Sequence, residues 1–213
     1  MPEDPGCRQP SELPVLVSAA QLQQHVMGLS SEIARDHSAG QVLCVVAVMK
    51  GALVFLADLV RHLPMPLEIE LVNARSYRGA QRQGDVKLLD DVASLPLTGR
   101  HILLVDCVLD SGQTLSVIHR EIAARAPASL KTCVLLSKSR PRSVDLSPEY
   151  VGLTIPDVFV VGYGLDYKNR WRHLPYLAEL PEALRRYCRT RSLGPRPSEA
   201  LRCKEGEAGD MEA

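Results

Sequence analysis

The stretch HILLVDCVLDSGQTLS, residues 101–116, decides the fold of this chain. Its apolar run, 102–105, has the continuous hydrophobic character of a strand that is buried on both faces of a parallel sheet. Asp106 follows that strand directly, and a short loop over 107–109 is expected to lead to a second acid, Asp110. The two acids therefore stand at the carboxyl end of a strand, which is where open α/β sheets bind their ligands.

A predicted helix starts in the same stretch, at the residues Ser-Gly-Gln-Thr, 111–114. Small and hydroxyl residues at a helix start leave backbone N–H groups free, and Gly112 lets the chain approach a ligand closely. Such a turn predicts a phosphate-binding site. The alternative from these residues alone is an ordinary strand and turn, followed by a helix that Ser111 caps.

Apolar patterning elsewhere predicts strands and helices in alternation. Ser18 and Gln21 fit a capping box at the start of an amphipathic helix, and Gly40 suits the position just past its end. Strands are expected over 41–48, 67–75, 86–89, 131–137, 150–155 and 158–161, and further helices over 52–63, 113–126 and 181–189. This alternation is typical of an α/β domain, a parallel sheet with helices on both faces.

Composition narrows the class of protein. The chain has 213 residues and a formal net charge of zero, so it carries no electrostatic footprint for nucleic acid or an anionic membrane. Lys50 and Asp58 interrupt the longest apolar run, which argues against a membrane span. The six cysteines contain no C-x-x-C pair, so we expect a reduced, cytoplasmic protein rather than a disulfide or zinc scaffold.

The two ends of the chain differ in composition from its middle. Residues 1–14 hold four prolines and are expected to form a mobile lead without the features of a signal peptide. Residues 191–213 have few apolar side chains and are expected to form a disordered tail. The domain is therefore predicted to span 15–190, with a mobile polar loop at 76–84.

Polar side chains follow four of the predicted strands where those strands end. The four exits hold Lys50 with Gly51, the stretch 106–114, Lys138 with Arg142, and Asp166 with Arg172. In a parallel sheet these ends lie along one edge and form a single crevice. Cations and N–H groups favour a substrate with more than one phosphate, and carboxylates beside them favour Mg²⁺ and ribose hydroxyl groups. The parts of a catalytic Ser–His–Asp set, a P-loop or a dinucleotide-binding motif are missing.

Five short segments carry these residues: MKG (49–51), RSY (75–77), VLDSGQT (108–114), LLSKSRPRS (135–143) and VFVVGYGLDY (158–167). In this order they resemble the motifs of type I phosphoribosyltransferases, and specifically of the hypoxanthine-guanine phosphoribosyltransferase family in its bacterial-like form. The resemblance runs from about Val15 to Leu180. It implies a Rossmann-like parallel sheet flanked by helices, with a small hood built from the terminal segments.

The resemblance also implies an enzyme of purine salvage. The expected reaction joins hypoxanthine or guanine to 5-phospho-α-D-ribose 1-diphosphate (PRPP), giving IMP or GMP and diphosphate, with Mg²⁺ as the cofactor. A homodimer or homotetramer is expected, without a nucleic-acid or membrane partner. The preference among hypoxanthine, guanine and xanthine stays open.

The family's PRPP loop matches the opening stretch. Asp110 matches the general base that takes the purine N7 proton while N9 attacks C1 of the ribose, and capping the following helix is its alternative role. The residues 111–114 match the cradle of the 5′-phosphate. The full set expected to contact PRPP is Asp106, Cys107, Val108, Leu109, Asp110, Ser111, Gly112, Gln113 and Thr114.

Purine recognition is implied at a second group of positions. Lys138 matches the residue that reads the 6-oxo group, and a surface lysine lying along apolar neighbours is the alternative. Phe159 matches the ring that stacks on the base, with a place in the core as its alternative. Val158, the Val160 carbonyl and Asp166 match groups along the edge of the base.

Pyrophosphate binding is implied at Lys50, Gly51 and Arg172. The family often has a cis peptide before this lysine, which here would be the bond from Met49.

The metal and the lid complete the implied site. Asp106 and Asp166 match the metal-side carboxylates, and Asp166 would act directly or through water. Ser76 and Tyr77 match the flexible lid that covers the reacting centre, and such a lid would exclude water from a reactive intermediate.

One position departs from the family's pattern. Two adjacent acids are expected at the end of the strand, where this chain has Asp106 and Cys107. Because a thiol is a weak, uncharged acceptor, we expect weaker handling of PRPP or Mg²⁺, by about 1.5–3 kcal/mol. Cys107→Asp is then predicted to lower the PRPP KM or raise kcat. The alternative function is a catalytically weakened, PRPP- or nucleotide-binding regulatory protein on the same fold, although Asp110 and Lys138 favour the enzyme.

Overall fold

A computed structural model describes residues 13–37, 40–76, 86–88, 92–142 and 144–185. The helices are α1 (Ala19–Arg35), α2 (Leu53–Arg61) and α3 (Gln113–Ala123), and a 3₁₀ turn spans Val92–Ser94. The strands are β1 (Val15–Val17), β2 (Leu43–Met49), β3 (Leu67–Ser76), β4 (Val86–Leu88), β5 (His101–Leu109), β6 (Ser129–Lys138), β7 (Tyr150–Ile155), β8 (Val160–Val161) and β9 (Leu177–Glu179).

The larger sheet has six strands in the order β4-β3-β2-β5-β6-β7. β2, β3, β5, β6 and β7 run parallel, and β4 pairs with β3 in the antiparallel direction. The central strand β2 is buried along most of its length, as its continuous apolar sequence predicts. The predicted α/β fold with a parallel sheet is confirmed.

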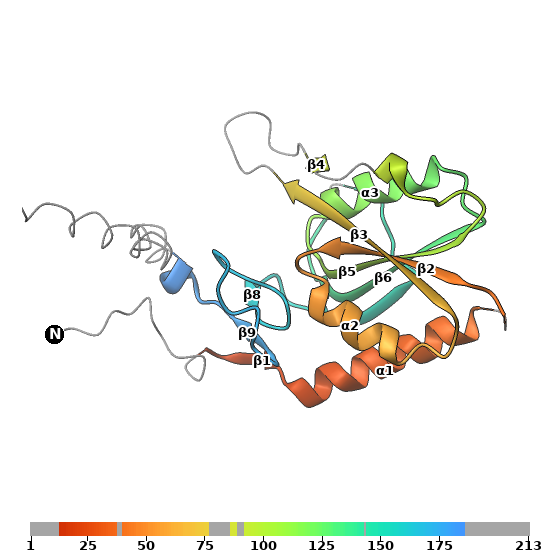
Figure 1. The fold of residues 1–213 in the computed structure, drawn as a ribbon. Coiled ribbons are helices and arrows are strands. Elements are labelled where there is room, and N and C mark those ends of the chain that lie inside the picture. The colour runs from red at the N-terminus through yellow and green to blue at the C-terminus, as the bar shows by residue number, and fades with distance from the viewer. Residues whose placement is uncertain (1–12, 38–39, 77–85, 89–91, 143, 186–213) are drawn as a thin grey trace, which may run out of the picture.

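Helices cover both faces of this sheet (Figure 1). α1 and α2 pack on the face formed by Val45 and Ala47 of β2, whereas α3 packs on the face formed by Cys44 and Val46. The predicted capping box of α1 is present, since the Gln21 backbone N–H donates to Ser18 Oγ and the Ser18 N–H donates to Gln21 Oε1.

The predicted loop over 107–109 is wrong, because β5 continues to Leu109. Val108 and Leu109 pair with Leu136 and Ser137 of β6, so the ladder holds the chain extended beyond Asp106. The side chains of Cys107 and Leu109 are also buried in the core. The strand therefore ends at Leu109, and Asp110 is the first residue after it.

A small antiparallel sheet, in the order β1-β9-β8, forms the predicted hood from the two ends of the domain. Figure 1 shows it beside one end of the larger sheet. Its own apolar cluster includes Leu13, Trp171 and Leu174, so the last residues of the predicted lead pack against the hood.

Several expectations fall on residues that lie outside the described ones. Tyr77 and residues 78–84 of the predicted loop, residues 1–12 of the lead and the tail 191–213 belong to this group. The last predicted helix is described only over 182–185, which are helical. Within the described part of the chain, no helix combines the length and apolar character needed to span a bilayer.

Candidate active site

The turn between β5 and α3 forms a small cavity of about 130 Å³. Its lining residues are Asp106, Val108, Leu109, Asp110, Ser111, Gly112, Thr114 and Leu115. All residues expected to contact PRPP, apart from Cys107 and Gln113, thus meet around one concave site. Their contact with PRPP stays a prediction.

Gly112 shapes the start of α3. It is the N-cap residue, its φ of +80° lies in the left-handed region, and a Cβ there would lie 2.6 Å from Val144 Cγ2. Glycine is therefore the residue that this turn requires. The alternative of a helix capped by Ser111 is wrong, since Gly112 is the cap and no side chain caps the helix. The N-terminal turn of α3 can thus offer N–H groups to a phosphate.

Asp106 lines this cavity from near the end of β5. Its Oδ1 accepts a hydrogen bond of 2.7 Å from the Cys107 backbone N–H. Burial raises the pKa of Asp106 to about 7, although the N–H groups of Cys107 and Val108 act in the opposite direction. Burial thus opposes the charged form of Asp106, and a cation bound beside it would favour that form.

Cys107 lies on the other face of the strand. Its side chain is fully buried among the apolar residues under α1 and α2, and burial raises the pKa of its thiol. A buried, protonated thiol behaves as a small apolar group. The side chain therefore packs in the core and does not line the phosphate cavity.

Asp110 belongs to a cluster of four charged side chains that follow or end the strands β5, β6 and β7. Its Oδ2 lies 3.4 Å from Lys138 Nζ, and its Oδ1 lies 2.9 Å from Arg140 Nη1. Asp157 approaches the same two cations, at 3.5 Å from Lys138 Nζ and 3.7 Å from Arg140 Nη1. Lys138 is only 8% exposed, so it is not the surface lysine of the alternative interpretation.

Two of the predicted pyrophosphate residues, Lys50 and Gly51, directly follow the end of the neighbouring strand β2. The peptide bond between Met49 and Lys50 is cis, in agreement with the resemblance. Gly51 lies against Gly164, where an added Cβ would come within 2.5 Å of the Gly51 carbonyl oxygen. The turn after β2 therefore touches the glycine-rich loop of the hood.

Arg172 connects that loop to Asp166. Its Nη1 donates to the Gly164 carbonyl oxygen at 2.6 Å, and its Nη2 lies 2.7 Å from Asp166 Oδ1. Asp166 also accepts a 2.6 Å hydrogen bond from the Asn169 backbone N–H. The structure thus brings Gly51, Asp166 and Arg172 close together through Gly164.

The expected purine-side residues lie in and beside the hood. The Phe159 ring meets the Tyr167 ring edge-on at 5.5 Å between centroids, and it is partly buried in the hood cluster. Val158 and Val160 pack against the main core. Stacking of a base on Phe159 stays a prediction. Of the lid, Ser76 ends β3, and Tyr77 is outside the described residues.

The carboxylates fit a magnesium ion that arrives with its substrate. Mg²⁺ binds to one or two carboxylates together with substrate phosphates and water. Asp106 and Asp166 would supply these carboxylates on the two sides of the crevice. Over the described ranges, no group of three or more His, Cys, Asp or Glu side chains is arranged to hold a metal ion.

Sequence reasoning missed two members of the charged cluster, Arg140 and Asp157. Arg140 stands two residues after Lys138, and Asp157 directly precedes the purine-side segment. Their pairing with Asp110 and Lys138 depends on how β6 and β7 lie beside β5. The nearest signal in the sequence is the position of both residues just after predicted strands.

Comparison with known proteins places the chain in a class. The family model described as "Phosphoribosyl transferase domain" matches residues 17–168. The fold and this match, which covers more than half of the chain, thus define a phosphoribosyltransferase.

Individual relatives narrow that class. The chain is 41% identical to the hypoxanthine-guanine phosphoribosyltransferase of Mycobacterium avium, over 81% of this chain and 90% of that protein. It is 38% identical to the hypoxanthine phosphoribosyltransferase of Salmonella typhimurium, over 78% of this chain and 94% of that protein. The crystal structure of a hypoxanthine-guanine phosphoribosyltransferase from Bacillus anthracis has 41% identity and a TM-score of 0.74, covering 80% of this chain and all of that one.

The chain belongs to the hypoxanthine-guanine phosphoribosyltransferase family. The predicted family, the bacterial-like form and the enzyme class are confirmed.

Proposed function

We propose that this chain converts hypoxanthine or guanine and PRPP to IMP or GMP and diphosphate in purine salvage, with Asp110 as the general base. The observation that supports it best is the cluster around Asp110. There, the proposed base and the proposed purine-reading Lys138 lie 3.4 Å apart, next to the cavity at the N-terminus of α3. A base and a phosphate-binding turn are side by side, as a purine attached to a 5′-phosphorylated ribose requires.

The 5′-phosphate is bound by the turn that precedes α3. Backbone N–H groups of 111–114 and the Thr114 hydroxyl would donate to its oxygens, and the helix N-terminus favours the negative charge. Asp106 would accept hydrogen bonds from the ribose hydroxyl groups in the same cavity. These contacts would hold C1 of the ribose at a fixed distance from the purine. Such positioning of the reacting atoms lowers the activation barrier.

The bond exchange takes place at C1 of the ribose. N9 of the base forms the new bond to C1 as the bond from C1 to the diphosphate oxygen breaks, and Asp110 takes the N7 proton. The leaving diphosphate carries away the electron pair of the broken bond. Lys50 and Arg172 would stabilise its charge from the opposite side of the crevice. Mg²⁺, held by Asp106 and Asp166 when bound with PRPP, would supply further charge neutralisation to the leaving group.

Selectivity for 6-oxopurines follows from Lys138. Its buried ammonium group lies between two carboxylates and can donate to an oxo group. Adenine has an amino group at this position, which cannot accept that hydrogen bond, so the lysine would lose a partner. Phe159, Val158 and the Val160 carbonyl would complete the purine pocket.

A regulatory PRPP-binding protein is the second candidate, but Cys107, the sequence feature that suggested it, packs in the core and does not line the phosphate cavity. One assay separates the two functions: conversion of labelled hypoxanthine in the presence of PRPP and Mg²⁺. The enzyme converts it at a rate that depends on both additions. PRPP binding without any turnover of hypoxanthine, guanine or xanthine would contradict the enzyme and support the regulatory protein.

Assembly and location are parts of the same proposal. Leu53 of α2 and Ile69 and Leu71 of β3 are about half exposed, at 53%, 47% and 49%. Apolar side chains exposed in this way favour a homodimer or a larger homo-oligomer. The buried free cysteines Cys44 and Cys133 are compatible with the reduced cytoplasm.

A further inference from the structure

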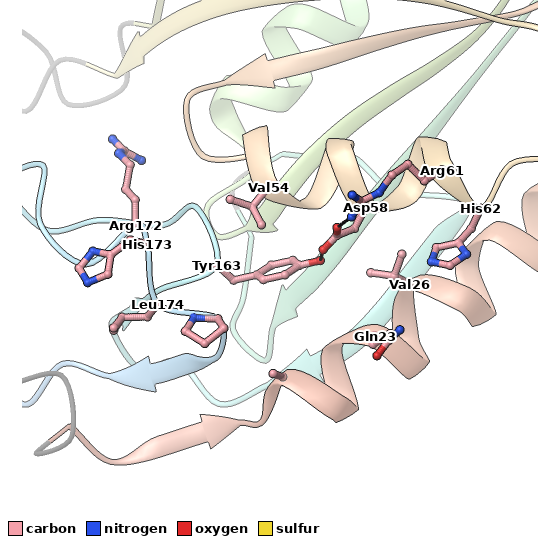
Figure 2. Close-up of a pocket in the computed structure, with 12 residues that line it drawn as sticks. Gln23, Val26, Val54, Asp58, Arg61, His62, Tyr163, Arg172, His173 and Leu174 are labelled. Atoms are coloured by element: carbon pink, nitrogen blue, oxygen red, sulfur yellow. Dashed lines mark hydrogen bonds and ion pairs between the residues drawn. The ribbon is translucent and has the colours of Figure 1, made fainter.

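Tyr163 in the hood and Asp58 on α2 are joined by a hydrogen bond that the reaction scheme does not use. Tyr163 Oη donates to Asp58 Oδ2 at 2.5 Å, and Arg61 pairs with the same carboxylate. Figure 2 shows the tyrosine reaching from the hood towards α2, with Asp58 and Arg61 opposite its hydroxyl. Burial and the neighbouring Asp58 raise the pKa of the Tyr163 hydroxyl, which therefore stays a donor at neutral pH.

A cavity of about 420 Å³ lies around this bond, between α1, α2 and the hood. Val26 of α1, Val54 of α2 and Leu174 of the hood are among the residues that line it (Figure 2). Side chains do not fill this space, so packing alone sets the distance between the hood and α2 less tightly there than at the contact of Gly164 with Gly51 and Val54. The hydrogen bond crosses beside the cavity and can set that distance.

The backbone around Tyr163 has little freedom. Gly162 and Gly164 have φ values of +97° and +94°, and a Cβ at Gly162 would lie 2.1 Å from the Tyr176 carbonyl oxygen. The Tyr163 N–H donates to the Leu174 carbonyl oxygen at 2.8 Å. A displacement of the tyrosine ring is therefore carried to its neighbours in the loop.

One of those neighbours, Gly164, links the two halves of the proposed diphosphate site. It lies against the Gly51 carbonyl on one side, and on the other it exchanges two hydrogen bonds with Arg172. The Gly164 N–H donates to the Arg172 carbonyl oxygen at 2.9 Å, and the Arg172 guanidinium donates to the Gly164 carbonyl at 2.6 Å.

Asp58 is connected to the Lys50–Gly51 turn, which is the other half of the proposed diphosphate site. α2 begins directly after the turn of Lys50 and Gly51, and the Leu53 N–H donates to the Lys50 carbonyl oxygen at 3.3 Å. Asp58 and the turn therefore move together as parts of one short helix. The bond from Tyr163 thus joins the element that carries Lys50 to the loop that orients Arg172.

We propose that Tyr163 is a positioning residue for diphosphate: through its hydrogen bond to Asp58 it sets the spacing between the Lys50–Gly51 turn and Arg172. The inference rests on the proposed function, because it assigns Lys50 and Arg172 to the diphosphate group of PRPP. It predicts that the hydroxyl of a residue outside the crevice controls affinity for one substrate and leaves affinity for the purine unchanged.

Tyr163→Phe tests this directly, since it removes the hydroxyl and keeps the ring. The expected result is a rise of the PRPP KM by about threefold to tenfold, the range for one lost hydrogen bond, with the hypoxanthine KM unchanged. The Kd of Mg²⁺-diphosphate, measured by calorimetry, should rise by the same factor. That binding measurement does not depend on turnover.

Tyr150→Phe is a matched control. The Tyr150 hydroxyl also donates to a carboxylate, Asp36 Oδ2 at 2.8 Å, and Tyr150 starts β7 at the amino end of that strand, away from the strand exits. Both variants lose one hydroxyl-to-carboxylate bond, so both should lose some thermal stability. Only Tyr163→Phe should weaken PRPP and diphosphate binding.

Two further variants test whether the weaker binding comes only from a general loss of stability. Asp58→Asn keeps an oxygen acceptor for the tyrosine and should restore most of the affinity that Asp58→Ala loses. In a double-mutant cycle, Tyr163→Phe and Asp58→Ala should be less than additive in the diphosphate Kd. Equal effects of Tyr163→Phe and Tyr150→Phe on the diphosphate Kd, or no effect of either, would overturn the inference. Absence of turnover in the unmodified enzyme would instead overturn the proposed function.

Discussion

Arg140 Nη1 lies 2.9 Å from Asp110 Oδ1, so the proposed general base is ion-paired with an arginine. Lys138 holds the second oxygen of the same carboxylate at 3.4 Å. A base that receives the purine N7 proton must release at least one of these partners. Asp157 lies within reach of both cations and can receive them when they leave.

Arg140→Gln should therefore make Asp110 easier to reach. We expect kcat/KM for hypoxanthine to rise by up to about fivefold, the range for a partly exposed ion pair of at most about 1 kcal/mol. Asp157→Asn removes the second negative charge and should lower kcat/KM, because Asp110 is then the one carboxylate of the cluster and holds both cations more strongly. Steady-state kinetics with saturating PRPP measures both. If Arg140→Gln lowers kcat/KM as much as Asp157→Asn does, Arg140 binds the substrate instead.

Lys138→Gln tests the assignment of purine selectivity. Loss of a charged donor to the 6-oxo group should lower kcat/KM for hypoxanthine by roughly 10- to 100-fold, the range for a charge-assisted hydrogen bond. The discrimination against adenine should fall by the same factor. Parallel assays with hypoxanthine, guanine and adenine measure this. Unchanged relative rates would place the 6-oxo contact on another residue.

The fold was predictable because its signals are local. Buried strands such as 43–49 are continuous apolar runs, and Ser18 with Gln21 marks the start of α1 within four residues. The error at 107–109 has the same origin. Asp106 interrupts the apolar pattern of β5, although pairing with β6 keeps the chain extended to Leu109.

The contacts within the site were less predictable, because they join distant segments. Asp110 and Arg140 are 30 residues apart, and Asp58 and Tyr163 are 105 residues apart. A single sequence shows which polar groups stand at strand exits. It does not show which of them pair, since that depends on sheet order and on the docking of the hood.

For substitutions of Cys107, the sequence and the structure predict different effects on PRPP binding. Because its thiol is buried in the core, Cys107→Ala should leave the PRPP KM almost unchanged and cost about 1 kcal/mol of stability. The expectation from the sequence that Cys107→Asp improves PRPP handling does not fit this position, because the side chain faces the core; the substitution places a carboxylate among apolar side chains and should lower the melting temperature. Kinetics and thermal unfolding of both variants test this. A large rise of the PRPP KM in Cys107→Ala would show that the thiol contacts substrate.

Asp36 predicts a pH dependence of stability. Hydrogen bonds from Lys131 and Tyr150, at 2.8 Å each, hold the pKa of this carboxyl below its ordinary value. The unfolded chain therefore takes up the proton first on acidification. The stabilisation is fully present above about pH 4 and is lost as the pH falls further.

The Asp36→Asn variant should accordingly lose less free energy of unfolding than the unmodified chain between about pH 5 and pH 3. Urea unfolding at a series of pH values measures this difference. If the free energy of unfolding has the same slope against pH in the two proteins, the carboxyl titrates alike in the folded and unfolded states.

The central claim is that Asp110 is the general base of a 6-oxopurine phosphoribosyltransferase. Asp110→Asn tests it most directly, in single-turnover conversion of labelled hypoxanthine with PRPP and Mg²⁺, with Asp157→Asn as the matched change in the same cluster. We predict that Asp110→Asn lowers the rate of the chemical step by about 10²- to 10⁴-fold while PRPP still binds. A rate within tenfold of the unmodified enzyme, or an equal loss in Asp157→Asn, would contradict the account.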